Sequence, residues 1–586
     1  MLKKIENIKK IDGILVILLA IFFFVSRSSY IDFGLPFIQQ EDEGVFLKST
    51  LSFINIISGL KSDLNDPVIA PFFNLLFTLI ILFLNEFIIN SIPLAEIKQK
   101  LYNDPSILII CGRYISLTIT SICIIILHLI FKKLKINFFI YFPLLISIAF
   151  SVFTLPISLV NGKNSYYLFF FLIQLYFLIK YYLKSEKFNK NSYLIFSILA
   201  ALAWGVNYWS CIVSIYGVLI LHYKKFKLTN FKYLFYFLLF FVIFGLLPNM
   251  FGREIFLDFF RTDSQFDKFS VSIYLDNIFE KMIFSLQIVL NTEKLIFIYP
   301  LLFIFYLFKK LKNKNIIILL SILFVEPILI IALAAQVIPE LRYFSGIICL
   351  IFILSALVVK DLSDYYKSKL IIIIFAAINT FIIFEKTITY DKLTNILISD
   401  HTFTNYFEKN KITNSNTLYL IPNLDIRKNL KNLNLYKNLH EKEIIKNKIF
   451  EKDNYNSILR KIEIEKNSNI NLKNEKLLDL HVFNMVLFDI KSYKALLNEV
   501  EKKYQFISIQ ESNFESNKIY SDYFDLYNYV KSNYSKVNQN YNGEELRYNN
   551  SFRDIMKYLY KGGNIKKLDK LVLGNNYSLY KLNHEN

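Results

Sequence analysis

Three consecutive acids, Glu41, Asp42 and Glu43, follow the first apolar segment of the sequence, in the stretch FIQQEDEGVFLKSTLSFI at residues 37–54. A carboxylate can serve as a general base that takes a proton from an attacking hydroxyl or amine. The alternative interpretation is a solvated polar cap on a short amphipathic helix, because acids stabilise helix N-termini. The other charged groups on the same side of the fold decide between the two interpretations.

Arginine is the second chemical signal, because only nine of the 67 basic residues are Arg. The planar guanidinium can bind phosphate oxygens through two parallel hydrogen bonds, whereas Lys offers a point charge. We predict that Arg342, Arg113 and Arg253 bind the phosphate of a ligand. For Arg27 and Arg261 the simpler interpretation is that they reach the membrane interface or pair with a nearby Asp.

The composition indicates a membrane protein with several spans. Of 586 residues, 54% are hydrophobic and 17% aromatic, and several apolar runs approach the roughly 20 residues that cross a bilayer. The net charge of +19 accompanies a general abundance of Lys and Asn, so it does not argue for a nucleic-acid partner. The Cys residues lie in apolar segments and the His residues lack ligand spacing, so we predict neither a metal nor another cofactor.

Hydropathy predicts eleven transmembrane helices, with residues 72–90 as a further apolar run. The clusters KKLK (132–135), KSEKFNK (184–190), KKFK (224–227) and KKLKNK (309–314) share the side of the N-terminal KKIENIKK only if this run does not cross. Lys and Arg favour the cytoplasmic side, so we interpret 72–90 as a re-entrant or surface helix. The eleven predicted spans are 11–26, 106–131, 138–159, 166–182, 192–206, 207–222, 231–250, 295–308, 316–335, 345–359 and 370–384.

This topology predicts a multi-pass plasma (inner) membrane protein with a cytoplasmic N-terminus. The acids, the loop VNGKNS (160–165) and the stretch QVIPELRY (336–343) then share the outer face. We divide the chain into an all-α membrane domain at 1–385 and a soluble extracytoplasmic domain at 386–586. In the second domain, residues 485–510 have the pattern of strand, helix and strand, which predicts an α/β or α+β fold.

The order of these segments resembles the integral membrane glycosyltransferases of the C superfamily (GT-C), which include protein O-mannosyltransferases and aminoarabinose transferases. The resemblance rests on EDEGVFLKSTLSFINIISGL, NDPVIAPFFNLLFTLI, GRYISLTITSICIIILHLIFKKLKI and IPELRYFSGIICLIFIL, and covers about residues 8–385. It implies a polyprenyl-phosphate sugar as donor and a lipid, glycan or protein as acceptor. It implies Asp42 as the catalytic residue that acts as the base or orients the acceptor, with Glu43 the alternative, and supports Arg342 as a contact to the donor phosphate.

Two departures from the family pattern leave the acceptor class and the metal dependence open. The loop after the third span reads VNGKNS instead of containing an acid, and the proline-rich stretch after the acidic pair is reduced to IAP. We therefore assign Lys163 and Asn164, together with Tyr343 and Lys48, to the substrate cavity.

The leading hypothesis is an inverting hexosyl- or pentosyltransferase acting at the outer face of the membrane. A transporter or lipid flippase is one alternative, although internal repeats typical of transporters are not evident. A polysaccharide polymerase or ligase is another, because it also uses lipid-phosphate substrates.

Overall fold

The computed structural model describes residues 2–32, 69–93, 106–183, 190–206 and 341–394 of the membrane half as continuous stretches. Positions 43, 46–47, 49–50, 96, 213–215, 235–239, 242–243, 283, 286–287, 289, 319, 322–323 and 325 are also described. In the C-terminal part the described residues are 397–398, 417–421, 481–484, 506–510, 532, 534–536, 547–549, 571–573 and 577–582.

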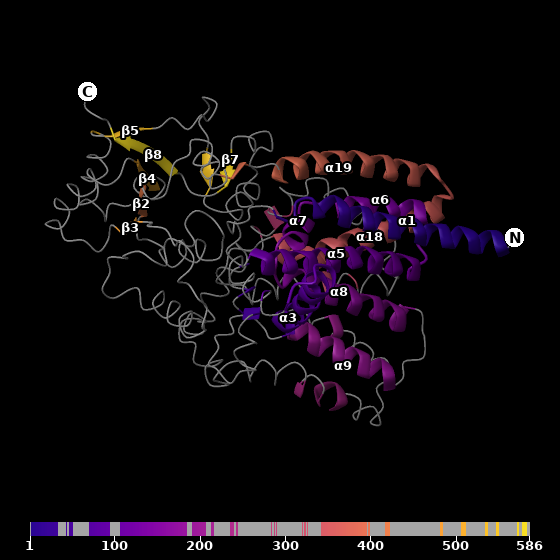
Figure 1. Cartoon of the computed structure of the whole chain (residues 1–586). Helices are drawn as coiled ribbons and strands as arrows, with labels where there is room; N and C mark the ends of the chain where they lie inside the picture. The colour runs from indigo at the N-terminus through magenta and orange to yellow at the C-terminus, as the bar shows by residue number, and fades with distance from the viewer. Residues whose placement is uncertain are drawn as a thin grey trace, which may run out of the picture.

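The described part of the membrane half is helical, and its long helices lie roughly alongside one another (Figure 1). Five helical segments within the described residues are long and apolar enough to cross a membrane: Ile11–Ser28, Ile69–Ile89, Ile107–Lys133, Arg342–Tyr366 and Leu370–Ile388. The helices are α1 (Leu2–Ser28), α3 (Ile69–Leu82), η1 (Phe83–Ile89), α5 (Ser106–Lys133), α6 (Phe138–Ala149), α7 (Thr154–Ser158), α8 (Asn164–Leu178), η2 (Ile179–Leu183), α9 (Lys190–Trp204), η7 (Leu341–Phe344), α18 (Ser345–Tyr366) and α19 (Leu370–Thr394).

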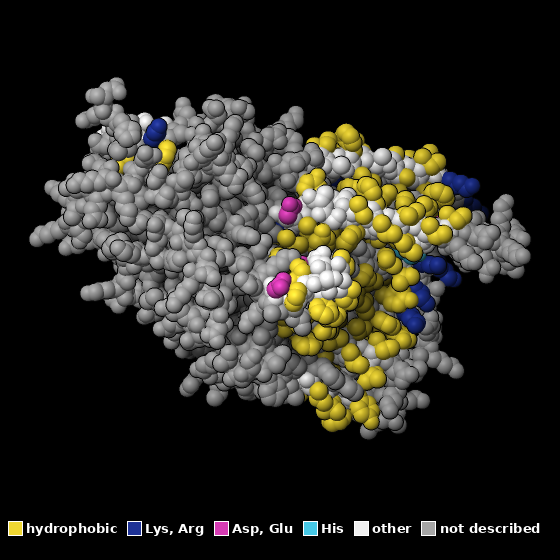
Figure 2. Space-filling view, in the orientation of Figure 1, with side chains coloured by type: hydrophobic (Ala, Val, Ile, Leu, Met, Phe, Trp, Pro, Cys, Tyr) yellow, Lys and Arg dark blue, Asp and Glu magenta, His cyan; other side chains and the backbone are white. Residues whose placement is uncertain are grey.

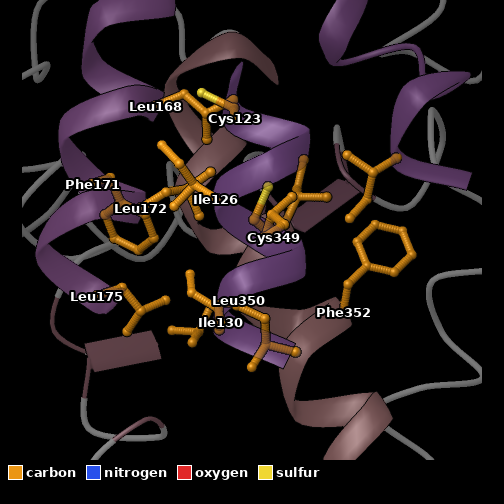
Figure 3. Close-up of a cluster of buried hydrophobic side chains, with 14 of the residues drawn as sticks. Cys123, Ile126, Ile130, Leu168, Phe171, Leu172, Leu175, Cys349, Leu350 and Phe352 are labelled. Atoms are coloured by element: carbon orange, nitrogen blue, oxygen red, sulfur yellow. The ribbon is translucent and has the colours of Figure 1, made fainter. Parts of the chain in front are cut away.

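The core of this bundle lies between α5, α8 and α18, where side chains such as Cys123, Phe171 and Cys349 interdigitate (Figure 3). In the spanning windows of α18 and α5, 78% and 67% of residues are buried, against 22–28% for α1, α3–η1 and α19. The outer helices turn apolar side chains away from the protein, for example Ile14 and Phe22 of α1. Such a surface is expected where hydrocarbon replaces water as the solvent.

Basic side chains mark one end of the bundle. In Figure 2 they gather at the end where α1 begins. Lys132 and Lys133 lie in the last turn of α5. The Lys360 ammonium donates to the carbonyl of Leu134, 3.1 Å away, so the C-terminal ends of α5 and α18 meet there. We call this the lysine end, and we call the opposite end, where α1 finishes and α5 begins, the arginine end.

Helices α1 and α5 are antiparallel neighbours. The Arg113 guanidinium in the second turn of α5 donates to the carbonyl of Ile31, just past the end of α1 (2.8 Å). The chain between them therefore leaves and re-enters the bundle at the same end, which requires an even number of crossings in between. Among the described residues of that interval, α3–η1 is the segment with the length of a span. Its re-entrant or surface position stays a prediction.

The run at 138–159, predicted as one span, is divided in the structure. Helix α6 ends at Ala149, a turn follows, and the short α7 occupies Thr154–Ser158. A break at this depth frees backbone carbonyls, which must find other partners away from water. Arg27 donates to the carbonyl of Ala149 (2.6 Å), and Lys386 of α19 lies 3.5 Å from that of Ser147. Two cations thus stabilise the C-terminal end of α6, where the helix dipole favours positive charge.

The C-terminal part contains strands in two sheets. A five-stranded sheet has the order β3 (His481–Asn484), β2 (Thr417–Ile421), β4 (Phe506–Gln510), β8 (Tyr577–Leu582) and β5 (Tyr534–Lys536). Strand β2 is parallel to both β3 and β4, whereas β8 is antiparallel to β4 and β5. The other sheet is parallel, in the order β1 (Leu397–Ile398), β7 (Leu571–Leu573) and β6 (Arg547–Asn549).

These strands bear on two expectations about the C-terminal domain. Strand β4 occupies the second predicted strand of the segment 485–510, while the first predicted strand and the helix expected after it lie outside the described residues. Helix α19 continues to Thr394, so the predicted domain boundary at 385 falls inside its last turns. The separate soluble domain stays a prediction.

Candidate functional site at the arginine end

The acidic stretch meets the bundle through Glu43, which forms a forked ion pair with Arg113 of α5. The Arg113 Nε atom lies 2.8 Å from Oε1 of Glu43, and Nη2 lies 2.7 Å from Oε2. The backbone N–H of Asn161 donates a third hydrogen bond to Oε1 at 2.7 Å. Glu43 is 0% exposed and Arg113 is 2% exposed. Both carboxylate oxygens are therefore engaged, and the pair is shielded from solvent.

Gly112 explains how the loop that carries Asn161 can approach so closely. A Cβ atom built on Gly112 would lie 2.2 Å from Cγ of Asn161, far inside contact distance. The absence of a side chain lets the loop at 159–163 pack on α5 and direct the N–H of Asn161 to Glu43. Gly112 thus provides the space for Asn161, and Arg113 provides the positive charge that pairs with Glu43.

Glu86 adds a second buried acid at this end, and sequence reasoning missed it. It lies in the π-helical segment η1, is 4% exposed, and accepts hydrogen bonds from the side chains of Asn85 (2.9 Å) and Asn90 (3.4 Å). Its carboxylate is within electrostatic range of Cys111, the residue before Gly112. The available signal was an acid between two Asn in an apolar run. Burying such a residue in a membrane segment is energetically costly, so its presence there indicates a function.

Arg342 lies at the start of the central helix α18. It belongs to the 3-10 turn η7, is 3% exposed, and its guanidinium carbon lies 5.3 Å from the ring centre of Tyr343. Tyr343, which was predicted to line the substrate cavity, is partly buried. It is therefore next to Arg342, the residue predicted to bind phosphate. The short turn η7 contacts α7, which brings Arg342 to the same end of the bundle as Arg27.

The predicted cavity residues Lys163 and Asn164 begin α8. Lys163 is the N-cap residue, and its carbonyl accepts a hydrogen bond from the N–H of Tyr167 (2.9 Å). Its side chain is partly exposed, whereas Asn164 is buried. Both therefore lie at the arginine end, in the loop that also supplies the N–H of Asn161.

Arg27 has a different environment from the one predicted for it. It is buried at 2% exposure instead of reaching the interface, and it donates to Thr154 Oγ1 (2.9 Å) and to Ser158 Oγ. Its guanidinium carbon also lies 4.3 Å from the ring centre of Phe23. These contacts, with the one to Ala149, assign Arg27 to the support of the break between α6 and α7.

Three predicted site residues, Asp42, Lys48 and Arg253, lie outside the described residues, so their roles stay predictions. Within the described part of the chain, no group of three His, Cys, Asp or Glu side chains converges as a metal site would require. That the protein works without a metal also stays a prediction.

One turn of α5 organises what the structure describes of this end. Cys111 lies within electrostatic range of the Glu86 carboxylate, Gly112 contacts Asn161, and Arg113 binds Glu43. Three consecutive residues thus connect α5 to three segments that are far apart in the sequence. Chemically, the arrangement provides fixed carboxylates and guanidinium groups in a protected layer, where charges interact more strongly than in water.

Comparison with known proteins adds no relative to this description: no family model, no curated protein and no solved structure matches the chain.

Proposed function

We propose that the chain is a membrane glycosyltransferase that moves a sugar from a polyprenyl-phosphate donor to an acceptor at the arginine end of the bundle. The observation that supports this most is the buried fork between Glu43 and Arg113, located at the same end as Arg342. Transfer from a phosphate leaving group needs a base for the acceptor and cations for the phosphate. This end of the bundle carries both kinds of group.

The fork also divides the roles of the two neighbouring acids. Glu43 accepts three hydrogen bonds and is fully buried, so an acceptor has no access to its oxygens. We therefore assign Glu43 to positioning of the acidic stretch and Asp42 to the base.

The arginines receive separate roles as well. The fork of Arg113 is directed to Glu43, with its third nitrogen on the carbonyl of Ile31, so we assign it a positioning role in place of phosphate binding. Arg342 remains the proposed phosphate ligand, because its buried guanidinium lies at the start of α18, at the same end of the bundle as Glu43. Arg253 remains a further candidate.

The proposed reaction is a direct displacement. Asp42 accepts the proton of the acceptor hydroxyl or amine, whose oxygen or nitrogen forms a bond to the anomeric carbon. The bond from that carbon to the phosphate oxygen breaks, and the polyprenyl phosphate leaves with the electron pair. Arg342 stabilises the negative charge that develops on the phosphate. The configuration at the anomeric carbon is inverted.

The positive-inside rule assigns the lysine end to the cytoplasm and the arginine end to the outer face of the plasma membrane. The C-terminal part follows α19, which runs from the lysine end towards the break in α6 at the arginine end. We therefore propose an extracytoplasmic position for the C-terminal part.

Deletion of the gene, followed by complementation, tests this function. Without the protein, the unused donor should accumulate among the lipid-linked sugars extracted from the membrane, and the wild-type protein should remove it. Asp42→Asn should lower the transfer rate at least about 100-fold, the lower range for loss of a general base.

Glu41→Gln is the matched control, because it neutralises the adjacent acid and should leave transfer intact. Equal protein levels in the membrane must accompany each comparison. If deletion causes no lipid-linked sugar to accumulate, the glycosyltransferase assignment is wrong. If Asp42→Asn restores transfer like the wild type, Asp42 is not the base.

A further inference from the structure

A group of buried polar side chains at the arginine end has hydrogen-bonding atoms without a partner among the described residues. The atoms without a hydrogen-bond partner are Oδ1 and Nδ2 of Asn161, Oδ1 of Asn164 and Oγ of Ser345. Their exposed fractions are 0%, 5% and 0%. A buried polar atom without a partner costs about 1–3 kcal/mol, so several of them in one region call for a ligand or an ordered water.

These three residues lie in one layer between α5, α8 and α18. Asn161 contacts Gly112 of α5, and Asn164 follows at the start of α8. A Cβ atom built on Gly346 would lie 2.9 Å from the hydroxyl of Tyr167, so the first turns of α18 and α8 are in contact. The same Cβ atom would lie 3.0 Å from the ring of Phe171, so Ser345 lies beside the first two turns of α8, which Asn164 begins. The apolar core of Figure 3 begins one turn further along these helices, at Leu168 and Cys349.

The chemistry of this layer fits an uncharged ligand that carries hydroxyl groups. A carboxamide offers one acceptor and two donors, and a serine hydroxyl can both donate and accept. A sugar presents the same mixture of donors and acceptors on adjacent hydroxyls. A phosphate, which only accepts, would leave the amide oxygens unmatched, whereas Arg342 one turn before Ser345 suits it well.

We propose that Asn161, Asn164 and Ser345 form the subsite that binds the sugar of the donor, with Arg342 holding the phosphate beside it. This inference rests on the proposed glycosyltransferase function and adds the recognition of the sugar to it. The side chains of this subsite are uncharged amides and a hydroxyl. Sugar recognition therefore depends on the positions of the sugar hydroxyls and not on charge or a metal ion.

Binding to the full-length protein in lipid nanodiscs tests the subsite. The probes are undecaprenyl phosphate alone and a panel of undecaprenyl phosphates carrying single hexoses or pentoses. Asn161→Ala should weaken binding of the preferred glycosylated probe about tenfold, because two hydrogen-bonding atoms are lost. The same substitution should change binding of undecaprenyl phosphate less than twofold. Arg342→Gln should weaken both probes.

Asn379→Ala provides the matched control, because Asn379 is an equally buried Asn of α19 whose side chain donates to the carbonyl of Phe375. It should leave binding of both probes unchanged. If Asn161→Ala fails to fold, Ser345→Ala carries the test, because it removes a single oxygen.

Three outcomes would overturn the proposal. If Asn161→Ala and Ser345→Ala leave both affinities unchanged, the layer holds ordered water only. If they weaken both probes equally, their effect is structural; in these two cases the glycosyltransferase function stands and the subsite is wrong. If the wild-type protein binds no glycosylated probe in preference to undecaprenyl phosphate, the donor class fails and the subsite fails with it.

Discussion

At the scale of single residues, the fork between Glu43 and Arg113 is the contact whose loss should be most costly. Removing one partner of a buried ion pair leaves the other charge unpaired in a medium of low dielectric constant. Here the remaining charge would also be far from water, because neither side chain is more than 2% exposed. The pair therefore acts as one unit that joins the acidic stretch to α5.

A double-mutant cycle should reveal this coupling. Glu43→Gln and Arg113→Gln should each lower the free energy of unfolding by about 3–5 kcal/mol, the range for breaking a buried pair. The double variant should lose less than the sum, because it leaves no unpaired charge. Unfolding of the purified protein in detergent measures all three. Glu96→Gln, at an exposed acid of the same region, should change stability by less than about 0.5 kcal/mol. Additive losses would contradict a direct pair.

Sequence reasoning found the chemical types at this site but not their partners. It singled out the acids at 41–43 and the rare Arg residues from composition alone, and it expected them at one end of the membrane domain. The partnership of Glu43 with Arg113 depends on how α5 packs against a loop 118 residues beyond Glu43, which periodicity does not encode. Glu86 was missed because the run at 72–90 was interpreted from its hydropathy and from the Lys clusters elsewhere in the chain, without regard to the acid within it.

At the scale of helices and loops, Gly112 controls how closely α5 and the loop at 159–163 approach. Gly112→Ala should force Asn161 away, weaken its hydrogen bond to Glu43, and lower stability by about 1–3 kcal/mol, as overpacking does. Gly13→Ala is the control, because a Cβ there meets nothing within 4 Å. That change should raise stability by up to about 1 kcal/mol, because Ala is the better helix former.

Thermal unfolding of both variants in the same detergent compares them directly. An equal response of the two glycines would show that helix propensity, and not contact with Asn161, governs position 112.

The helices themselves were the more predictable part. Four of the eleven predicted spans, 11–26, 106–131, 345–359 and 370–384, coincide with α1, α5, α18 and α19, because long apolar runs specify such helices directly. The division of 138–159 was not predicted. It depends on Arg27 and Lys386 from distant helices, which provide partners that no local pattern contains.

At the scale of the whole molecule, the antiparallel α1 and α5 make a clear prediction about topology. In a variant without its native Cys, Glu96→Cys should react with a membrane-impermeant maleimide added to intact cells. Lys369→Cys, between α18 and α19, should react only after the membrane is permeabilised. Both positions are exposed, so access to the reagent depends on the side of the membrane. Labelling of Glu96→Cys only after permeabilisation would require a crossing by α3–η1.

The charge distribution of the whole bundle was foreseen better than its architecture. Lys clusters were expected on one side of the membrane and Arg on the other. Among the described residues, Lys132 and Lys360 lie at one end of the bundle and Arg113 and Arg342 lie at the other. The side of the membrane that each end faces stays a prediction. The crossing order of strands β3, β2 and β4 was beyond sequence reasoning, since strand pairing depends on contacts far apart in the chain.

The two cations at the end of α6 impose an order on the biosynthesis of the bundle. Arg27 comes from the first helix and is present when α6 enters the membrane, whereas Lys386 comes from α19, which the ribosome makes more than 200 residues later. Until then, the carbonyl of Ser147 lacks its cation. We expect nascent chains that stop before α19 to be cleaved by proteases near residues 147–153, and chains that include it to be resistant.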